Sequence, residues 1–250
     1  MRKVLVTGAS SGIGRATARA FADLGDTVAV HYATDRLGAE HTRAALPGGG
    51  HTIVSGDIGN PAQARNLVEQ AVSALGSLDV LVNNAAVAPT TANRHPITDT
   101  SYDQWCTVWQ HMVNVNLLGS ANVIWAAAQH MAAGGRIINV GSRGAFRGEP
   151  EHPAYGASKA ALHALGQSLA IALAPRGIAV SSVAPGFVSS ERQQPKLSSE
   201  EGTALRQQSP LGRVGTPAEV ASAIVYLASP EAEWTTGAIL DVNGASHLRT

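Results

Sequence analysis

Short apolar segments rich in Val and Ile alternate with longer segments of helical character along the whole chain. Segments that are apolar almost without interruption form strands that are buried on both faces of a sheet. Strands that alternate with helices pair in parallel, because each connection must cross back over the sheet. Seven segments fit this description: residues 3–6, 27–32, 51–57, 78–86, 135–142, 177–186 and 237–244.

The intervening segments predict helices on both faces of that sheet. They cover residues 12–25, 35–46, 61–75, 104–131 and 217–229, with one more helix between the fifth and sixth strands. No internal repeat or interdomain linker is visible, so the sequence predicts one α/β domain over residues 1–250, with a doubly wound, seven-stranded parallel sheet. Two polar connections, 87–103 and 187–215, are long enough to be binding loops, and we interpret 187–215 as a substrate loop.

The composition limits what the protein binds and where it works. Hydrophobic residues make up 44% of the chain, and 18 basic residues balance 18 acidic ones. A neutral chain with scattered charges is not expected to bind nucleic acid or an anionic membrane. No segment is apolar over the roughly 18 residues of a membrane helix, and the N-terminal apolar run is too short for a signal peptide. We therefore expect a soluble cytoplasmic protein.

The chain has a single cysteine, Cys106, which excludes a disulfide within the chain. A lone cysteine is consistent with a reducing compartment. No histidine lies close to it in the sequence, so we interpret Cys106 as a small, buried apolar side chain rather than a nucleophile.

A glycine-rich turn, TGASSGIG at residues 7–14, follows the first strand and opens the first helix. Gly8, Gly12 and Gly14 allow the backbone to turn tightly and to approach a ligand. The helix N-terminus then presents unpaired N–H groups and a partial positive charge to a phosphate. An ordinary tight turn is the alternative interpretation, and the position between strand and helix favours phosphate binding.

Polar and glycine residues also follow several other strands. Asp57, residues 83–86, residues 141–144 and residues 185–190 come at the ends of the third to sixth strands. Ligands of open α/β sheets bind at the carboxyl ends of the strands, where the strand order reverses. These segments are therefore expected to line one ligand site.

Tyr155 and Lys159 are four residues apart on a predicted helix, so they lie on the same face about 6 Å apart along the axis. A free tyrosine has a pKa of about 10, too high for proton transfer near neutrality. A lysine at about 4 Å would stabilise the phenolate by about 4 kcal/mol and lower that pKa by two to three units, with burial cancelling part of the effect. The pair is therefore a candidate general acid/base. The alternative is an exposed pair on a solvated helix, which the small neighbours at 156–158 disfavour.

Taken together, these motifs resemble the short-chain dehydrogenase/reductase family over essentially the whole chain. The matching segments occur in family order: TGASSGIG, Asp57, NNAA at 83–86, NVN at 114–116, Ser142, YGASK at 155–159 and PG at 185–186. The resemblance implies a Rossmann fold that binds a nicotinamide dinucleotide.

The resemblance also implies a catalytic set. Tyr155 is the acid/base, and Ser142 binds the substrate carbonyl or hydroxyl. Lys159 lowers the tyrosine pKa and holds the nicotinamide ribose, while Asn116 anchors a water in the proton relay. Each of these has a structural alternative, such as a turn serine at 142 or a packed asparagine at 116, and the complete set favours catalysis.

The implied cofactor site covers the dinucleotide from the adenine to the nicotinamide. Asp57 would contact the adenine amino group and Ile58 would pack on the ring. Two positions depart from the family pattern, Ala86 for glycine and Ser190 for threonine, and both changes are small. The candidate residues are Gly8, Ser10, Ser11, Gly12, Ile13, Gly14, Thr34, Arg36, Asp57, Ile58, Asn84, Ala85, Ala86, Tyr155, Lys159, Pro185, Gly186, Val188 and Ser190.

The end of the second strand bears on the choice of cofactor. NAD-preferring members carry an acidic residue there, which binds the ribose hydroxyls, whereas this chain has Tyr32. Thr34 and Arg36, with help from Arg15, could bind a 2′-phosphate. The expected cofactor is NADP(H), with NAD(H) possible because Asp35 could still reach the ribose.

The expected reaction is hydride transfer between the nicotinamide and the carbonyl or secondary alcohol carbon of a small molecule. A 3-oxoacyl-carrier-protein reductase is an alternative, as is a regulatory protein that senses nicotinamide redox state without turnover. Residues 87–96, 143–152 and 187–208 are expected to form the substrate pocket. Candidate contacts there are Arg143, Phe146, His152 and Phe187.

Three of the four tryptophans, Trp105, Trp109 and Trp125, fall on one predicted helix. We interpret them as buried between helices, either within the subunit or between subunits. The family resemblance implies a homotetramer or a homodimer.

Overall fold

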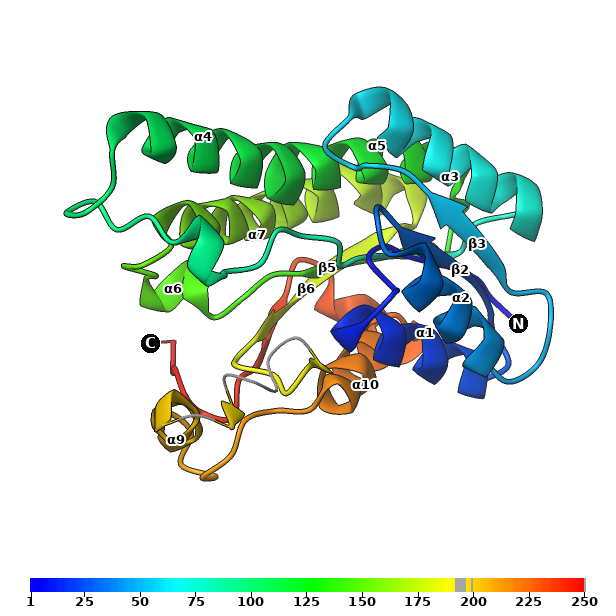
Figure 1. Cartoon of the computed structure of the whole chain (residues 1–250). Helices are drawn as coiled ribbons and strands as arrows, with labels where there is room; N and C mark the ends of the chain where they lie inside the picture. Colours follow the sequence, from blue (N-terminus) through cyan, green and yellow to red (C-terminus); the bar gives the residue numbers. More distant parts are fainter. Residues whose placement is uncertain (192–196, 199, 250) are drawn as a thin grey trace.

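The expected sheet forms in the computed structural model, which describes residues 1–191, 197–198 and 200–249 (Figure 1). Seven strands pair in parallel in the order β3-β2-β1-β4-β5-β6-β7. The order reverses between β1 and β4, which are neighbours with Leu5 opposite Leu81. The strands are β1 Lys3–Val6, β2 Thr27–Tyr32, β3 Thr52–Ser55, β4 Val80–Asn83, β5 Arg136–Val140, β6 Ala179–Pro185 and β7 Ile239–Val242.

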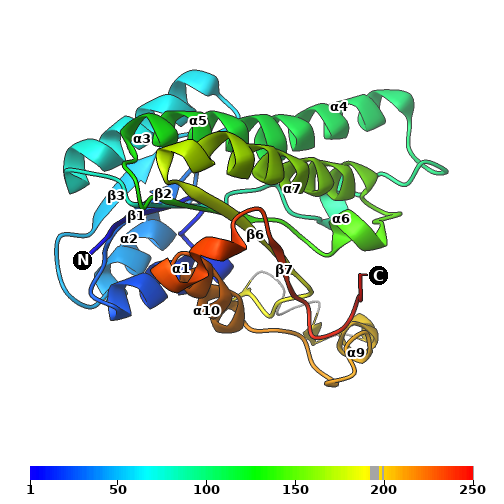
Figure 2. The ribbon, with the colours of Figure 1, turned by 180° about the vertical axis from the view of Figure 1, so that it is seen from behind.

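Helices cover both faces of the sheet, so the predicted doubly wound α/β architecture is confirmed (Figures 1 and 2). One face carries α1, α2 and α10, and the other carries α3, α4, α5 and α7. Each face has its own core cluster, one including Phe21 and Ile224 and the other including Leu67 and Ile137. The helices are α1 Gly12–Asp23, α2 Arg36–Ala45, α3 Pro61–Leu75, α4 Tyr102–Val113, α5 Ser120–His130, α6 Gly144–Arg147, α7 Pro153–Leu173, α9 Glu200–Gln207 and α10 Pro217–Leu227.

Local sequence signals set several helix ends. The side chain of Asn60 accepts hydrogen bonds from Ala62 N and Gln63 N, and Pro61 stands at the first helical position of α3. The same helix ends at Gly76, which has a φ of 86° and closes the last turn. Thr216 and Glu219 form a reciprocal capping box at the start of α10.

The single long helix expected over 104–131 is interrupted by a wider turn. Residues 114–119 form a π-helical segment between α4 and α5. Gly119 lies in this segment, where a Cβ would come within 2.8 Å of Ile58 O. The helix therefore passes directly over the end of β3, and a bulge of this kind often marks a functional site.

Two other expectations need correction, and of the two alternatives for Trp125 only burial between subunits stays a prediction. Cys106 is exposed rather than buried, because α4 presents that side to solvent. Trp125 is 60% exposed, so it is not buried within the subunit, whereas Trp105 and Trp109 pack on each other with ring centroids 5.5 Å apart. The connection 187–215 contains the helix α9, and its residues 192–196 and 199 lie outside the described part of the chain.

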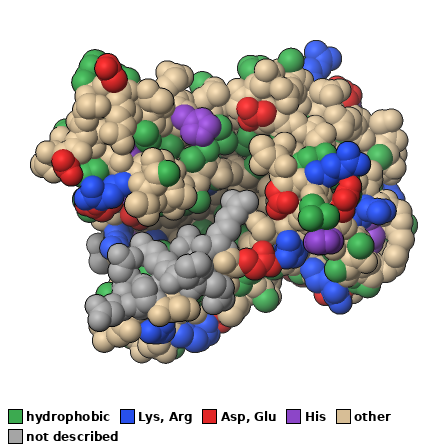
Figure 3. All heavy atoms as spheres, in the orientation of Figure 1, with side chains coloured by type: hydrophobic (Ala, Val, Ile, Leu, Met, Phe, Trp, Pro, Cys, Tyr) green, Lys and Arg blue, Asp and Glu red, His purple; other side chains and the backbone are tan. Residues whose placement is uncertain are grey.

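Within the described residues, no helix has both the length and the apolar character that crossing a membrane requires. Basic and acidic side chains are interspersed over the face shown in Figure 3. This distribution agrees with the balanced charge of the sequence.

The core contacts of α1 lead to a stability prediction. Phe21 is fully buried, so Phe21→Ala should lower the free energy of unfolding by about 3–5 kcal/mol through lost burial and the resulting cavity. Leu24, at the end of the same helix, is 59% exposed, and Leu24→Ala should change the free energy of unfolding by less than about 0.5 kcal/mol. Urea titration of both variants measures the difference; equal losses would contradict this view of the core.

Candidate active site

The glycine turn between β1 and α1 lies against the ends of two other strands. Gly8 has a φ of 63°, and a Cβ there would lie 2.9 Å from the Cα of Ala85. Gly12 has a φ of 54°, and a Cβ there would lie 3.4 Å from the Cβ of Ser190. A side chain at Gly14 would overlap the carbonyl oxygen of Gly8. These glycines are needed because three backbone segments meet closely here.

The first helix leaves its N-terminus open to a ligand. Ser11 is the N-cap residue with extended backbone, and its side chain makes no capping hydrogen bond among the described residues. The N–H groups of the first turn of α1, which includes Ile13, therefore have no side-chain cap. Ser10, next to the cap, is buried. Open helix N-termini of this kind bind phosphate groups in other proteins.

Two side chains that the sequence analysis missed hold this turn in place. Thr7 Oγ1 accepts hydrogen bonds from the N–H groups of Asn84 and Ala85 at 2.9 and 3.0 Å. His31 is fully buried in β2 and accepts a hydrogen bond from Gly8 N at 3.0 Å. Burial lowers the pKa of His31, which keeps the ring neutral and able to accept. A histidine inside an apolar strand was the signal that could have revealed it.

The ends of β3 and β4 form the expected adenosine side. Asn84 donates from Nδ2 to Thr7 O at 2.8 Å and to Gly8 O at 3.1 Å, which ties the β4 end to the glycine turn. Asp57 is exposed and accepts a hydrogen bond from Gly59 N. Ile58 is only 2% exposed because its side chain belongs to the core under α3, leaving little of it to pack on an adenine ring.

The catalytic candidates come together where β5 ends and α7 begins. Ser142 follows β5, and its Oγ accepts a hydrogen bond from Gly144 N at 3.0 Å. Tyr155 and Lys159 lie on α7, with the lysine Nζ 6.0 Å from the tyrosine ring centroid. Lys159 is 3% exposed and donates to Val140 O at 2.8 Å.

The electrostatics of this pair differ from the expectation. Burial raises the pKa of Tyr155 to about 12, while a hydrogen bond with Ser142 acts in the opposite direction and Glu149 adds to the increase. Burial also lowers the pKa of Lys159 to about 8. The pKa of Tyr155 is therefore raised where we expected Lys159 to lower it, because removing the phenolate from water outweighs the hydrogen bond with Ser142.

Asn116 lies in the π-helical segment and is completely buried. Its Oδ1 accepts from Val87 N at 2.7 Å, and its Nδ2 donates to Val87 O and to Ser158 Oγ. The Ser158 hydroxyl donates in turn to the backbone oxygen of Tyr155. Asn116 thus links the loop after β4 to the helix turn that carries the tyrosine.

A third missed residue, His95, supports the start of α7. It is completely buried, and its Nε2 accepts a hydrogen bond from Ala154 N at 3.1 Å. Its Nδ1 donates to Asn93 O. The nearby Arg94 pairs with Glu151 just before the helix. The long loop 87–103 therefore fixes the helix N-terminus directly before Tyr155.

His163 lies one helical turn beyond Lys159 and is 3% exposed. A Cβ at Gly141 would overlap its ring, so the glycine before Ser142 makes room for the imidazole. The ring stacks on Phe146 with centroids 5.3 Å apart, and neither ring nitrogen has a hydrogen-bond partner among the described residues. Burial lowers the pKa of His163 to about 4, with Lys159 adding to the effect.

The segment after β6 closes the other side of the site. Gly186 lies against β7, where a Cβ would come within 2.9 Å of Asn243 Cα. Pro185 and Val188 are buried, and Val188 bridges to Gly215. Ser190 faces Gly12 of the glycine turn. The segment expected to cover the nicotinamide therefore lies next to the expected phosphate site.

The residues expected to select the cofactor lie beside the glycine turn. Asp35 caps α2 by accepting a hydrogen bond from Gly38 N at 2.9 Å, so its carboxylate already has a structural partner. Arg36 is exposed and pairs with Glu40 on the same helix. Arg15 donates to Ser10 O and pairs with Glu191, both at 2.5 Å. Thr34 precedes the cap and is exposed.

Of the expected substrate contacts, Arg143 is buried and Phe146 is 38% exposed. His152 hydrogen-bonds Thr90 O at 3.0 Å, which places it at the loop 87–103 rather than free in a pocket. Phe187 directly follows the β6 segment and is partly exposed. Arg143 and Phe187 thus line one cavity with Leu205 of α9, whereas Phe146 stacks on His163 and His152 lies at the loop 87–103.

A parallel sheet that reverses at β1 and β4, with an open glycine turn and a Ser–Tyr–Lys set at its carboxyl edge, defines a class of nucleotide-dependent oxidoreductases. A family model described as enoyl-(acyl carrier protein) reductase matches residues 8–247. The chain belongs to the short-chain dehydrogenase/reductase family, whose members act on alcohol and carbonyl groups.

Its relatives within that family have different substrates. It is 38% identical to L-rhamnose 1-dehydrogenase (NAD(P)(+)) of Sphingomonas sp. strain SKA58, over 99% of this chain and 96% of that one. It is 35% identical to 3-oxoacyl-[acyl-carrier-protein] reductase of Staphylococcus aureus, over 99% and 98% of the two chains. A solved short-chain dehydrogenase of Burkholderia cenocepacia in complex with NADP has a TM-score of 0.88 at 31% identity, covering 98% and 97%.

The buried, neutral His163 predicts a pH dependence of stability. Its pKa falls from 6.5 in the unfolded chain to about 4 on folding, so the unfolded state binds more protons between these values. The neutral ring contributes on the order of 3 kcal/mol to the free energy of unfolding. This contribution is fully present above pH 6.5 and is lost as the pH falls toward 4.

His163→Leu should therefore flatten the dependence of unfolding free energy on pH in this window. Urea titrations at several pH values measure it. The difference in unfolding free energy between the two proteins at pH 8 serves as the control, because at that pH it reports only the change in packing. Parallel curves for the two proteins would contradict the buried neutral ring.

Proposed function

We propose that the protein transfers hydride between NADP(H) and the carbonyl or secondary alcohol carbon of a small molecule, with Tyr155 as the general acid/base. The observation that supports this most strongly is the meeting of Ser142, Tyr155 and Lys159 at the same sheet edge as the open N-terminus of α1. The glycine turn fits a dinucleotide, because Gly8 and Gly14 let the backbone pack tightly against Asn84 and Ala85 while the N-terminus of α1 has no side-chain cap and stays open to the phosphates.

Each catalytic side chain then has a defined part. The bound nicotinamide supplies or accepts the hydride. Ser142 holds the substrate oxygen, and its hydrogen bond with Tyr155 aligns the phenol with that oxygen. Because its pKa is about 12, Tyr155 is protonated at neutral pH and ready to donate a proton to the oxygen of a carbonyl undergoing reduction.

Lys159 and Asn116 act behind the tyrosine. Lys159 donates to Val140 O and lies on the same face of α7 as the tyrosine. Its ammonium would stabilise negative charge that develops on the phenol and would hold the ribose of the cofactor. Asn116 holds the backbone of Val87 and, through Ser158, that of Tyr155. These hydrogen bonds fix the position of the loop after β4 relative to α7. Its proposed water contact would complete the proton path.

NADP(H) is the proposed cofactor because the carboxylate of Asp35 is committed to capping α2. Two guanidinium groups, those of Arg15 and Arg36, lie on the elements that flank the expected ribose position, and Thr34 adds a hydroxyl. A 2′-phosphate would compete with Glu191 for Arg15 and with Glu40 for Arg36.

A small molecule is the proposed substrate, since the balanced charge of the chain does not favour an acidic carrier protein as partner. The catalytic set disfavours a purely regulatory role. We further propose a homotetramer or homodimer, for which the 60% exposed Trp125 provides an apolar surface. The exposed thiol of Cys106 is kept reduced most readily in the cytoplasm, where we place the enzyme.

Removal of the phenol tests the mechanism. Tyr155→Phe should lower kcat by about 10²- to 10⁴-fold because the proton donor is lost, while the Kd for NADPH changes less than about twofold since the ring is kept. Nicotinamide absorbance measures turnover and fluorescence titration measures binding. Near-normal turnover in this variant would refute the assignment.

The cofactor assignment predicts a preference that depends on Arg15. The wild type should show a higher kcat/KM with NADPH than with NADH, and Arg15→Met should lower the NADPH value by about tenfold or more while leaving the NADH value within about threefold. Arg65, which is exposed on α3 and paired with Glu69, provides the control variant Arg65→Met. A clear NADH preference in the wild type would overturn the assignment.

A further inference from the structure

Two arginine side chains shortly after Ser142 in the sequence, Arg143 and Arg147, converge on one uncharged oxygen. Arg143 Nη2 lies 2.5 Å and Arg147 Nη1 lies 2.8 Å from Gln208 Oε1 at the end of α9. Arg143 is only 6% exposed, whereas Arg147 is exposed. Among the described side chains, no carboxylate pairs with either guanidinium.

This arrangement leaves positive charge without an opposite charge to balance it. Burial and the neighbouring Arg147 lower the pKa of the Arg143 guanidinium. Glu149 is the nearest carboxylate that affects it, but that group packs against Gly144 and hydrogen-bonds neither arginine. A buried cation is normally paired, since the amide of Gln208 replaces only part of its lost hydration.

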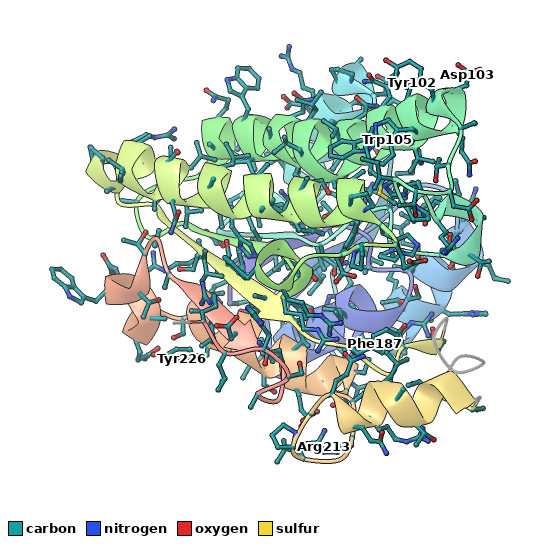
Figure 4. All side chains as sticks on the ribbon, turned by 90° about the vertical axis from the view of Figure 1, so that its left-hand side faces the viewer. Tyr102, Asp103, Trp105, Phe187, Arg213 and Tyr226 are labelled. Carbon is teal, nitrogen blue, oxygen red and sulfur yellow. The ribbon has the colours of Figure 1, made fainter. Side chains whose placement is uncertain are left out.

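The same guanidinium lines a cavity next to the catalytic edge of the sheet. The cavity has a volume of about 120 Å³, which is below the range of whole small-molecule sites and suits one end of a small substrate. Its other arginine, Arg213, already makes a bidentate pair with Glu219 at 2.6 and 2.9 Å. Figure 4 shows Phe187 above the connection that carries Arg213. The walls include Phe187, Leu205, Ser209, Leu211 and Asn243.

The chain itself ties this cavity to the proposed reaction centre. Arg143 directly follows Ser142, so their Cα atoms are about 3.8 Å apart. Phe187 directly follows Pro185 and Gly186, which are expected to cover the nicotinamide. The cavity therefore borders the two segments expected to hold the substrate oxygen and to cover the nicotinamide.

We propose that the enzyme is selective for substrates that carry a carboxylate a few carbon atoms from the reacting carbon, and that Arg143, assisted by Arg147, binds this carboxylate. The inference rests on the proposed function and adds the substrate class. A guanidinium binds a carboxylate through two parallel hydrogen bonds. A single negative charge balances the one buried arginine, and the apolar walls suit the hydrocarbon between the two polar ends.

The test compares substrates that differ only in charge. We expect 4-oxocyclohexanecarboxylate to have a kcat/KM at least about tenfold above that of its ethyl ester. Arg143→Met should lower the kcat/KM for the acid by about 10- to 100-fold and leave the kcat/KM for the ester unchanged. Arg143→Lys should keep part of the preference. Arg147→Met, at an exposed position that folding does not require, should weaken it by a smaller factor, and Arg65→Met should not change it.

Binding without turnover provides an independent measurement. Cyclohexanecarboxylate should compete with the ketone in the wild type, and its inhibition constant should rise by a similar factor in Arg143→Met, whereas cyclohexanecarboxamide should bind weakly to both. Circular dichroism and cofactor binding check that each variant is folded.

The outcomes distinguish this inference from the proposed function. Equal efficiency with acid and ester, or a preference that survives in Arg143→Met and Arg147→Met, overturns the inference and leaves the reductase assignment intact. An Arg143-dependent preference for acetoacetyl-CoA over both test ketones assigns the arginines to a phosphate and also overturns it. Failure to reduce any ketone with NADPH or NADH would instead refute the proposed function.

Discussion

The site depends on one close contact between backbones at the point where the strand order reverses. Because β1 and β4 are parallel neighbours, the glycine turn after β1 meets the loop after β4, and Asn84 Nδ2 bonds the carbonyl oxygens of Thr7 and Gly8. A Cβ at Gly8 would lie 2.9 Å from Ala85 Cα, so the contact tolerates only glycine. The orientation of α1, and hence of its open N-terminus, follows from this contact.

Hydrogen bonds of buried polar groups also fix the positions of other segments around the site. His31 supports the glycine turn, Asn116 joins the loop after β4 to α7, and His95 holds the first turn of α7. A buried polar atom is costly unless it is hydrogen-bonded, so these groups fix particular geometries rather than adding much net stability. The phenol of Tyr155, the proposed proton donor, lies in the same buried surroundings, and burial keeps it protonated at neutral pH.

Much of this could be predicted from residue order. The seven apolar segments and the strand–helix alternation predicted the sheet and its two helical layers, and both are present. The sheet edge at which the site lies stays a prediction from the glycine turn and the motifs. The supporting residues His95 and His163 were not predicted, since a histidine on a loop or helix has no pattern that marks its burial. The exposure of Cys106 was missed for the same reason, because the helix face that a neighbour covers depends on packing.

The sequence alone determined the class of fold and the side chains able to do the chemistry, because periodicity and motif spacing are local properties of the chain. Only the tertiary structure decided the charge balance around those side chains. Desolvation set the direction of the Tyr155 pKa shift, and the meeting of Arg143 and Arg147 at Gln208 joined segments about sixty residues apart. Both effects depend on which distant atoms exclude water or share a hydrogen bond, and that is a property of packing.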